Sequence, residues 1–448
     1  MNQQMDKQLP EGWETTQLAE VADIILGQSP DGKTVNSEGK GIVFYQGKAE
    51  FGLLHPTPRN YCTNPKKIAK ENDILLSVRA PVGPTNLANQ ETAIGRGLAA
   101  IRETQITNFK FILFYFRNIE QWLSQQGTGT TFQAISGQFI RDLPFPLPPL
   151  AEQHYLADKL DSLLARIQTL SDQLAAVPAL LKQFRQSVLA DAVSGKLTAE
   201  WRKLAGCEQP WLEKTLPQMT AVKGGKTPSK ANLKYWENGS VVWISAKDMK
   251  FKKIESSVDL ITEQAVIESG MTKFPENTVL LVTRSGILSH TLPVALTKVP
   301  VTINQDLKAF TPDTSQLLPD FLYLLLKGSE YRILRTCSKA GTTVASVEMN
   351  QLEKLPFLLP SIAEQTEIVR RVETLFALAD DIEQQSRAAA ERVALLTQSV
   401  LAKAFRGELS EQWRREHPDL ISGDNSAAAL LARIQAERAA TGKKSRRA

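Results

Sequence analysis

Two stretches of the chain carry apolar residues at alternating spacings of four and three. The first stretch runs from Leu156 to Val188 and the second from Ile368 to Val400. This heptad spacing is typical of a long helix whose apolar seam pairs with another helix. We expect the seam to include Leu156, Leu160, Leu163, Ile167, Leu170, Leu174, Ile368, Val372, Leu375, Ile382, Val393 and Leu396.

The length of these stretches indicates what covers the seam. A helix over 151–193 would be roughly 65 Å long at 1.5 Å per residue, and Pro178 should kink it. One domain of about 150 residues is too small to cover such a stripe. We therefore expect the two helices to pair with each other as an antiparallel coiled coil. The alternative is that each helix packs on its own domain.

The regions before each helix have a different pattern, in which short apolar runs alternate with turns rich in glycine, proline and asparagine. The runs 74–78 and 279–282 are predicted strands, and 109–122 and 321–334 are predicted amphipathic helices. The fold class is therefore α+β. Prolines at 144–149 and 356–360 are expected to end each globular domain and precede a helix.

The sequence contains an internal repeat, as residues that recur at a constant offset show. Glu152, Gly195 and Arg202 recur 212 positions later as Glu364, Gly407 and Arg414, and many pairs share this offset. Earlier landmarks recur at smaller offsets, so the second copy gained residues between fixed points. A period this long indicates two copies of a domain plus its connector. The predicted domains are 1–149, 150–207, 208–360 and 361–448.

Composition excludes several classes of protein. With 42% hydrophobic and 23% charged residues the chain is globular. It has no run of about 18 apolar residues and its first residues are polar, so we expect neither a membrane span nor a signal peptide. Its three cysteines lack CxxC spacing, which favours the reducing cytoplasm. The net charge of +5 is a weak indication of nucleic acid.

Motifs for catalysis are missing. The run 224–227 resembles the end of a phosphate-binding loop, but Thr220 stands where its first glycine belongs. An adenine methyltransferase needs an Asn/Asp-Pro-Pro-aromatic tetrad, and Asn64-Pro65 is followed by Lys66. The four histidines lack metal-ligand spacing. We therefore expect no catalytic residue, no metal site and no cofactor in this chain.

Paired helices that join two similar domains could set a fixed distance between two binding surfaces. If the helices run antiparallel, the copies are related by a pseudo-twofold axis, and duplex DNA has local twofold symmetry too. Diverged copies could then read different half-sites one or more helical turns apart. The same architecture could bind protein instead, so a helical scaffold that never touches DNA is the alternative.

Particular motifs carry a resemblance to a known family. They are Leu9-Pro10-Glu11-Gly12-Trp13, residues 147–153, Gly195-Lys196-Leu197-Thr198 with Trp201-Arg202, the second-copy runs 359–365 and 402–409, and the tail 419–431. In these motifs and in domain order the chain resembles the specificity subunit of Type I restriction-modification enzymes, and its tail resembles the K-type (Type IA) subgroup. The resemblance is specific in the helical regions and loose in the variable domains.

The resemblance implies a function and a set of partners. Such a subunit reads double-stranded DNA through two target recognition domains and binds two adenine-N6 methyltransferase subunits through its helices. Restriction subunits driven by ATP with Mg²⁺ can join the complex. The methyltransferase partner takes S-adenosylmethionine and flips the target adenine out of the duplex. This chain would position that partner without catalysing a reaction.

Candidate DNA contacts are residues suited to base edges or phosphates that sit in turns or after matched strands. Surface solvation or turn structure is an equally good interpretation of each. The candidates are Gln28, Gln46, Lys48, Arg79, Thr130, Thr131, Lys226, Lys247, Arg284, Thr342 and Thr343.

Overall fold

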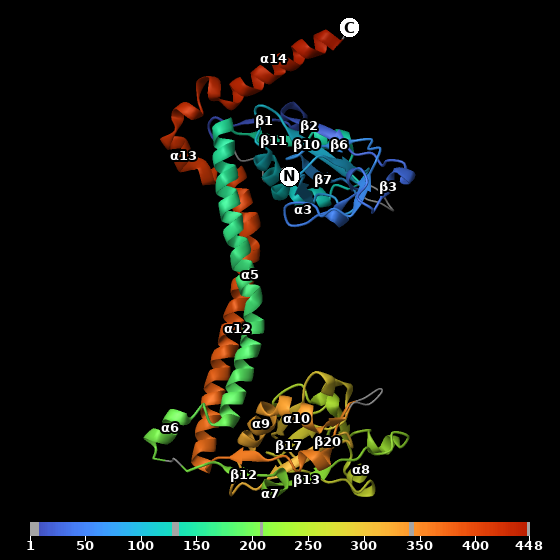
Figure 1. The fold of residues 1–448 in the computed structure, drawn as a ribbon, viewed down its shortest axis with the longest axis vertical. Helices are drawn as coiled ribbons and strands as arrows, with labels where there is room; N and C mark the ends of the chain where they lie inside the picture. The colour runs from blue at the N-terminus through green and yellow to red at the C-terminus, as the bar shows by residue number, and fades with distance from the viewer. Residues whose placement is uncertain (1–8, 128–133, 207–208, 340–344, 446–448) are drawn as a thin grey trace. The chain divides into compact units, whose positions relative to one another are not determined.

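The computed structural model describes residues 9–127, 134–206, 209–339 and 345–445. The chain divides into two compact units. Unit 1 comprises Met1–Leu174 and Ala388–Ala448, and unit 2 comprises Ala175–Arg387. Each unit therefore combines one globular domain with segments of both long helices (Figure 1).

Unit 1 contains a four-stranded sheet in the order β2-β10-β7-β8, a five-stranded sheet in the order β3-β5-β4-β9-β6 and a β1-β11 pair. Its strands are β1 Glu14–Gln17, β2 Ala22–Leu26, β3 Val35–Asn36, β4 Ile42–Tyr45, β5 Asn60–Cys62, β6 Ile68–Ala69, β7 Ile74–Ser77, β8 Thr85–Leu87, β9 Thr92–Ile94, β10 Leu98–Glu103 and β11 Pro144–Leu147. Its shorter helices are α2 Leu18–Val21, α3 Phe109–Ser124, α4 Gly137–Arg141, α13 Glu411–Glu416 and α14 Ala427–Ser445, with 3₁₀ turns η1 Gly32–Thr34, η2 Lys48–Glu50, η6 Glu408–Ser410, η7 Pro418–Leu420 and η8 Gly423–Asn425.

Unit 2 has a related arrangement, with sheets in the orders β13-β20-β17-β18-β15 and β16-β14-β19 and the pairs β12-β23 and β21-β22. Its strands are β12 Leu212–Lys214, β13 Thr220–Gly224, β14 Val241–Ile244, β15 Lys253–Ile254, β16 Asp259–Ile261, β17 Val279–Val282, β18 Val294–Thr297, β19 Val301–Ile303, β20 Leu307–Pro312, β21 Ser338–Lys339, β22 Ser346–Val347 and β23 Phe357–Leu359. Its shorter helices are α6 Ala199–Leu204, α7 Leu216–Met219, α8 Glu263–Glu268, α9 Pro319–Gly328, α10 Glu330–Cys337 and α11 Met349–Leu352, with 3₁₀ turns η3 Leu233–Tyr235, η4 Ala246–Asp248 and η5 Gly286–Ser289. The predicted α+β class is confirmed.

Most of the predicted elements are present, with two differences. The expected helix over 321–334 is two helices, α9 and α10, which meet at Ser329. Gly328, the last residue of α9, packs closely against the helix Leu150–Ser194. A Cβ at this position would lie 2.8 Å from the Leu189 carbonyl oxygen, which is too close for a side chain. The proline-rich run 144–149 precedes a helix as predicted, since the helix Leu150–Ser194 begins directly after it. The difference is that residues 144–147 of this run form a strand, β11, which pairs with β1. Each strand of a two-stranded pair has one edge without a partner strand. Proline, which lacks an N–H donor, is tolerated at positions that face this free edge.

The two heptad stretches form the long helices α5 Leu150–Ser194 and α12 Ile362–Phe405. Pro178 lies inside α5 without ending it. The helices lie side by side within each unit (Figure 1). In unit 2, Arg185 of α5 forms ion pairs with Asp380 and Glu383 of α12 at 2.7 and 2.9 Å. The start of α5 lies near the end of α12 in unit 1, and the end of α5 lies near the start of α12 in unit 2, so the pairing is antiparallel.

The seam residues nearest the globular domains are buried. Leu156 and Leu160 are inaccessible in unit 1, as are Ile368 and Val372 in unit 2. Farther along the helices burial decreases, and Leu170, Ile382 and Leu396 are each at least 40% exposed. The seam assignment as a whole stays a prediction.

Each domain core includes both long helices. In unit 1, Phe405 near the end of α12 packs against Phe111 of α3, with ring centroids 4.9 Å apart, in the cluster that also holds Leu156. In unit 2, Val188 and Ala192 of α5 join the cluster that holds Ile368 of α12. A helix thus packs on the domain it follows at one end and on the other copy's domain at its other end.

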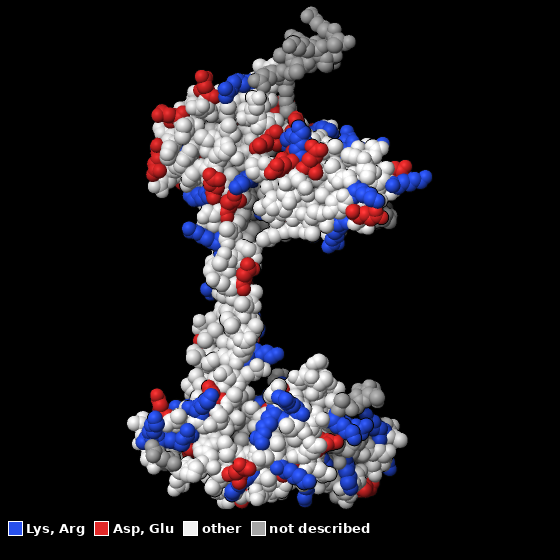
Figure 2. All heavy atoms as spheres, viewed as in Figure 1, with Lys and Arg blue, Asp and Glu red and all other residues white. Residues whose placement is uncertain are grey.

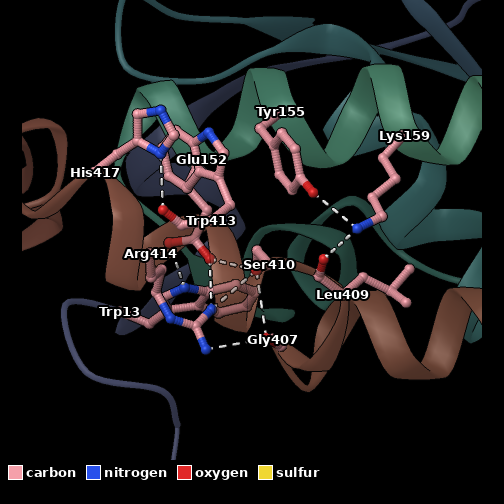
Figure 3. Close-up of polar contacts among 10 residues, drawn as sticks. All are labelled: Trp13, Glu152, Tyr155, Lys159, Gly407, Leu409, Ser410, Trp413, Arg414 and His417. Atoms are coloured by element: carbon pink, nitrogen blue, oxygen red, sulfur yellow. Dashed lines mark hydrogen bonds and ion pairs between the residues drawn. The ribbon is translucent and has the colours of Figure 1, made fainter.

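A buried carboxylate organises the junction in unit 1 (Figure 3). Glu152 in the first turn of α5 is fully buried and forms an ion pair with Arg414 at 2.6 Å. It also accepts hydrogen bonds from the Trp13 indole at 2.9 Å and the Ser410 hydroxyl at 2.5 Å. Arg414 in turn donates to the Gly407 carbonyl oxygen. These contacts join the start of the domain, the start of α5 and the segment that follows α12.

Unit 2 contains the same network at the matched positions. Glu364 forms an ion pair with Arg202 at 2.6 Å and accepts hydrogen bonds from Trp211 and Thr198. Arg202 donates to the Gly195 carbonyl oxygen. Gly195 and Gly407 both have the positive φ, 80° and 70°, that glycine adopts without strain. The recurring glycine, tryptophan and arginine of the sequence repeat are therefore explained by one junction built twice.

The Arg414→Ala variant should lose about 3–5 kcal/mol of unfolding free energy, because it leaves Glu152 buried without its cation. Urea denaturation of the full chain measures this loss. The control is Arg415→Ala, which removes a surface pair to Glu411 and should cost at most about 1 kcal/mol. Equal midpoints for the two variants would show that the buried pair does not hold the junction.

Candidate nucleic-acid interface

In unit 1, three predicted contact residues converge on the turn between β9 and β10. The Gln28 amide donates to the Ile94 carbonyl, and the Gly95 amide donates to the carbonyl of Tyr45, the residue before Gln46. The Val78 amide, one residue before Arg79, donates to the Gly97 carbonyl. The turn 94–98 therefore fixes three loops that come from three different parts of the sequence.

In unit 2 the turn between β19 and β20 gathers the matched residues. The Lys226 amide donates to the Ile303 carbonyl, and the Asn304 amide donates to the carbonyl of Ile244, which precedes Ser245. The Arg284 amide donates to the Asp306 carbonyl at 3.2 Å. Arg79 and Arg284 also form equivalent isolated bridges, to Ala134 and Ser346. The structure thus confirms the residue matches made from the repeat.

Two glycines allow these loops to approach so closely. A Cβ on Gly27 would lie 2.1 Å from the Gly95 carbonyl oxygen, and one on the matched Gly225 would lie 2.0 Å from the Ile303 carbonyl oxygen. Neither distance is compatible with a side chain, since the obstructing atom belongs to the backbone. Gly27 and Gly225 are therefore required for the loops that bear Gln28 and Lys226.

The predicted residues differ in how free their side chains are. Gln28, Gln46, Lys48, Arg79 and Arg284 are exposed. Lys226 and Lys247 are also exposed but already engaged, Lys226 with the Ser269 carbonyl at 3.2 Å and Lys247 with Asp259 at 2.6 Å. The candidates Thr130, Thr131, Thr342 and Thr343 lie outside the described residues. All of these DNA contacts stay predictions.

The structure adds three residues to the candidate DNA contacts, none of which the sequence patterns singled out. Arg96 and Gln305 are the exposed residues in the middle of the two turns. Lys308 lies beside Gly224, since a Cβ on Gly224 would be 2.8 Å from its ammonium nitrogen. The run Gly95-Arg96-Gly97, an arginine between two glycines, was the available signal for the first of them. No local pattern marks the other two.

The charge of the globular domain suits a polyanion better in unit 2 than in unit 1. Residues 208–360 hold 18 Lys and Arg against 15 Asp and Glu, whereas residues 1–149 hold 14 of each. On the face drawn in Figure 2, basic side chains predominate over the globular domain of unit 2. Beneath the unit 1 turn, burial raises the pKa of the Tyr45 phenol to about 12.

No group of three or more His, Cys, Asp or Glu among the described residues is placed to hold a metal ion. In the same part of the chain, no helix combines the length and the apolar character that crossing a membrane requires.

The Gly27→Ala variant should destabilise the chain by about 1–3 kcal/mol, because the added methyl group must displace the 94–98 turn. Chemical denaturation measures the change. Gly32→Ala is the matched control, since nothing lies within 4 Å of a Cβ at that position and its φ is not positive. A Gly27→Ala variant as stable as Gly32→Ala would contradict the proposed packing of the two loops.

Comparison with known proteins places the chain in a family. Residues 10–179 and 208–392 match the model of the Type I restriction modification DNA specificity domain. The chain is 32% identical to the Type I restriction enzyme EcoKI specificity subunit of Escherichia coli strain K12, over 97% of each chain. It is 35% identical to the EcoBI specificity subunit of Escherichia coli, over 74% of this chain and 73% of that one.

A solved structure gives a partial match. The HsdS subunit from Thermoanaerobacter tengcongensis is 45% identical over 36% of this chain and 40% of its own, with a TM-score of 0.34. The assignment rests on the family model, which covers both copies of the repeat, and on the full-length relatives. These matches do not favour the helical-scaffold alternative. The chain belongs to the family of Type I restriction-modification DNA specificity subunits, and it is a non-catalytic DNA-recognition subunit.

Proposed function

We propose that each globular domain reads one half of a bipartite, asymmetric DNA site and that the two long helices act as the spacer. The observation that carries this proposal is the turn at which exposed Arg and Gln side chains from separate loops gather, built in the same way in both units. Arg and Gln have the donors and acceptors that base edges and phosphates require. Two such surfaces on one chain fit a split target.

Differences between the two copies support an asymmetric target. Arg79 and Arg284 are the same residue at the same place, which suits the phosphate backbone because phosphates are alike in every sequence. By contrast, Gln28 is matched by Lys226 and Gln46 by Ser245. Half-sites of different sequence require differences of this kind.

We further propose that two adenine-N6 methyltransferase subunits dock on the long helices, one on each unit. Large apolar side chains stay exposed on these helices: Leu170, Leu395 and Leu396 in unit 1, and Leu180, Phe184 and Leu378 in unit 2. Leu395 is 73% exposed and Leu180 is 60% exposed. Exposed large apolar side chains on these helices suit a protein partner better than water.

The cofactors belong to the partners in this proposal. The methyltransferase subunits take S-adenosylmethionine, and restriction subunits that join the complex use ATP with Mg²⁺. The contribution of this chain is to hold a methyltransferase over the half-site so that the flipped adenine reaches it.

The Arg284→Ala variant should weaken binding of the target DNA roughly 5- to 100-fold without unfolding the chain. Arg284 is exposed, so its removal leaves the core intact. A gel shift of the chain assembled with its methyltransferase gives the affinity, and a thermal melt gives the stability.

The control is Arg370→Ala, which removes an exposed arginine of α12 and its surface pair with Glu367. We expect it to bind DNA like the wild type. Unchanged binding by Arg284→Ala would remove Arg284 from the interface.

The Leu395→Glu and Leu180→Glu variants should each lose methyltransferase during co-purification, because a carboxylate replaces an apolar contact in the docked complex. The readout is the ratio of the two subunits on a sizing column. Leu204→Glu is the control, since Leu204 is 90% exposed but lies on α6, off the long helices. Full retention by all three variants would disprove docking at these positions.

A further inference from the structure

Arg96 and Gln305 hold the same place in the two copies. Arg96 lies between β9 and β10, and Gln305 lies between β19 and β20. Their turns make the same hydrogen bonds: Leu98 donates to Gly95 as Leu307 donates to Asn304, and Val78 donates to Gly97 as Thr283 donates to Asp306. The two side chains therefore leave their domains from one equivalent backbone site.

The backbone of each turn is fixed before any DNA arrives. In unit 1, a Cβ on Gly97 would lie 2.4 Å from the Gln46 carbonyl oxygen, so the turn packs directly on the loop after β4. In unit 2, the Asn304 side-chain amide donates to the Asp306 carboxylate, and the Asp306 backbone amide donates to the Asn304 side-chain oxygen. The Asp306 carbonyl accepts from both the amide and the hydroxyl of Thr283. A fixed turn positions its exposed side chain without loss of backbone entropy on binding.

Both side chains are available to a ligand. Arg96 is exposed, and its guanidinium makes no hydrogen bond or ion pair within the part of the chain that the structure describes. Gln305 is exposed, and its carbonyl oxygen accepts a hydrogen bond from the Thr227 hydroxyl. That bond orients the amide and leaves a lone pair and both N–H donors for a partner.

The two residues differ in the property that distinguishes bases. A guanidinium offers two parallel donors that match the O6 and N7 acceptors of guanine, whereas a glutamine amide offers one donor and one acceptor that match N7 and the N6 amino group of adenine. Arg79 and Arg284, beside the same turns, are identical in both copies. The turn centre is thus a position where the copies share a backbone but differ in the base they would select.

We propose that Arg96 and Gln305 are base-reading residues, with Arg96 selecting a guanine in the first half-site and Gln305 selecting an adenine in the second. This inference rests on the proposed DNA-reading function and goes beyond it by assigning the specificity of one position in each half-site. Arg96 and Gln305 act in the major groove, where the four base pairs present distinct patterns.

The test is selection of bound DNA from a random-sequence library by the chain assembled with its methyltransferase. The wild-type chain should yield a two-part site. The Arg96→Gln variant should change one guanine of one half-site to adenine, and Gln305→Arg should change one adenine of the other half-site to guanine. Arg96→Ala should lose roughly 5- to 150-fold of discrimination at that single position.

Arg166→Gln, an exposed arginine on α5 of unit 1, is the control and should leave the site unchanged. The inference is overturned if Arg96→Gln selects the wild-type site, or if Arg96→Ala weakens binding equally for all sequences, as loss of a phosphate contact would. In either case the proposed function still stands. A wild-type complex that selects no sequence at all would instead overturn the proposed function together with the inference.

Discussion

The buried carboxylate at the start of each long helix is the interaction on which the rest of the structure depends. Glu152 has no contact with water and needs a cation, which Arg414 provides from 262 positions later in the chain. Glu364 is served in the same way by Arg202. A carboxylate buried so completely is tolerated only when it is paired and hydrogen-bonded. In unit 1, the segment that holds Arg414 therefore cannot leave the start of α5 without leaving the buried Glu152 carboxylate unpaired, which costs free energy.

This pairing exchanges helix ends between the two copies of the repeat. The segment after α12, which belongs to the second copy, completes the domain of the first copy, and the segment after α5 completes the domain of the second. Apolar packing follows the same exchange, since Phe405 lies against Phe111 and Gly328 lies against the backbone of α5. In each unit the junction between domain and helices is therefore a packed core and not a flexible linker.

The proposed reading surface combines a backbone frame that is alike in both copies with side chains that differ between them. The constant part is a backbone frame: Gly27 or Gly225 lets one loop approach, the strand ends contribute carbonyls, and the bridges of Arg79 and Arg284 close the frame. The variable part consists of the side chains that project from it, among them Gln28 and Lys226 or Arg96 and Gln305. Because the frame is fixed by backbone contacts, side chains at its surface can change without loss of the fold. In the proposed function, duplication followed by such changes gives one chain two different readers.

The sequence by itself determined the repeat, the α+β class, the family and the span of the helices. The helix predicted over 151–193, for example, extends from Leu150 to Ser194 in the structure. These features are periodic or local, so they can be read along one dimension. Tertiary structure alone decided that Glu152 pairs with Arg414 and not with Arg202, which is nearer in the sequence. It also decided that the predicted 321–334 helix breaks at Ser329. Finally, it brought the loops of Gln28, Gln46 and Arg79 to the turn that holds Arg96. Each of these depends on contacts between residues far apart in the chain, for which no local pattern of residue types exists.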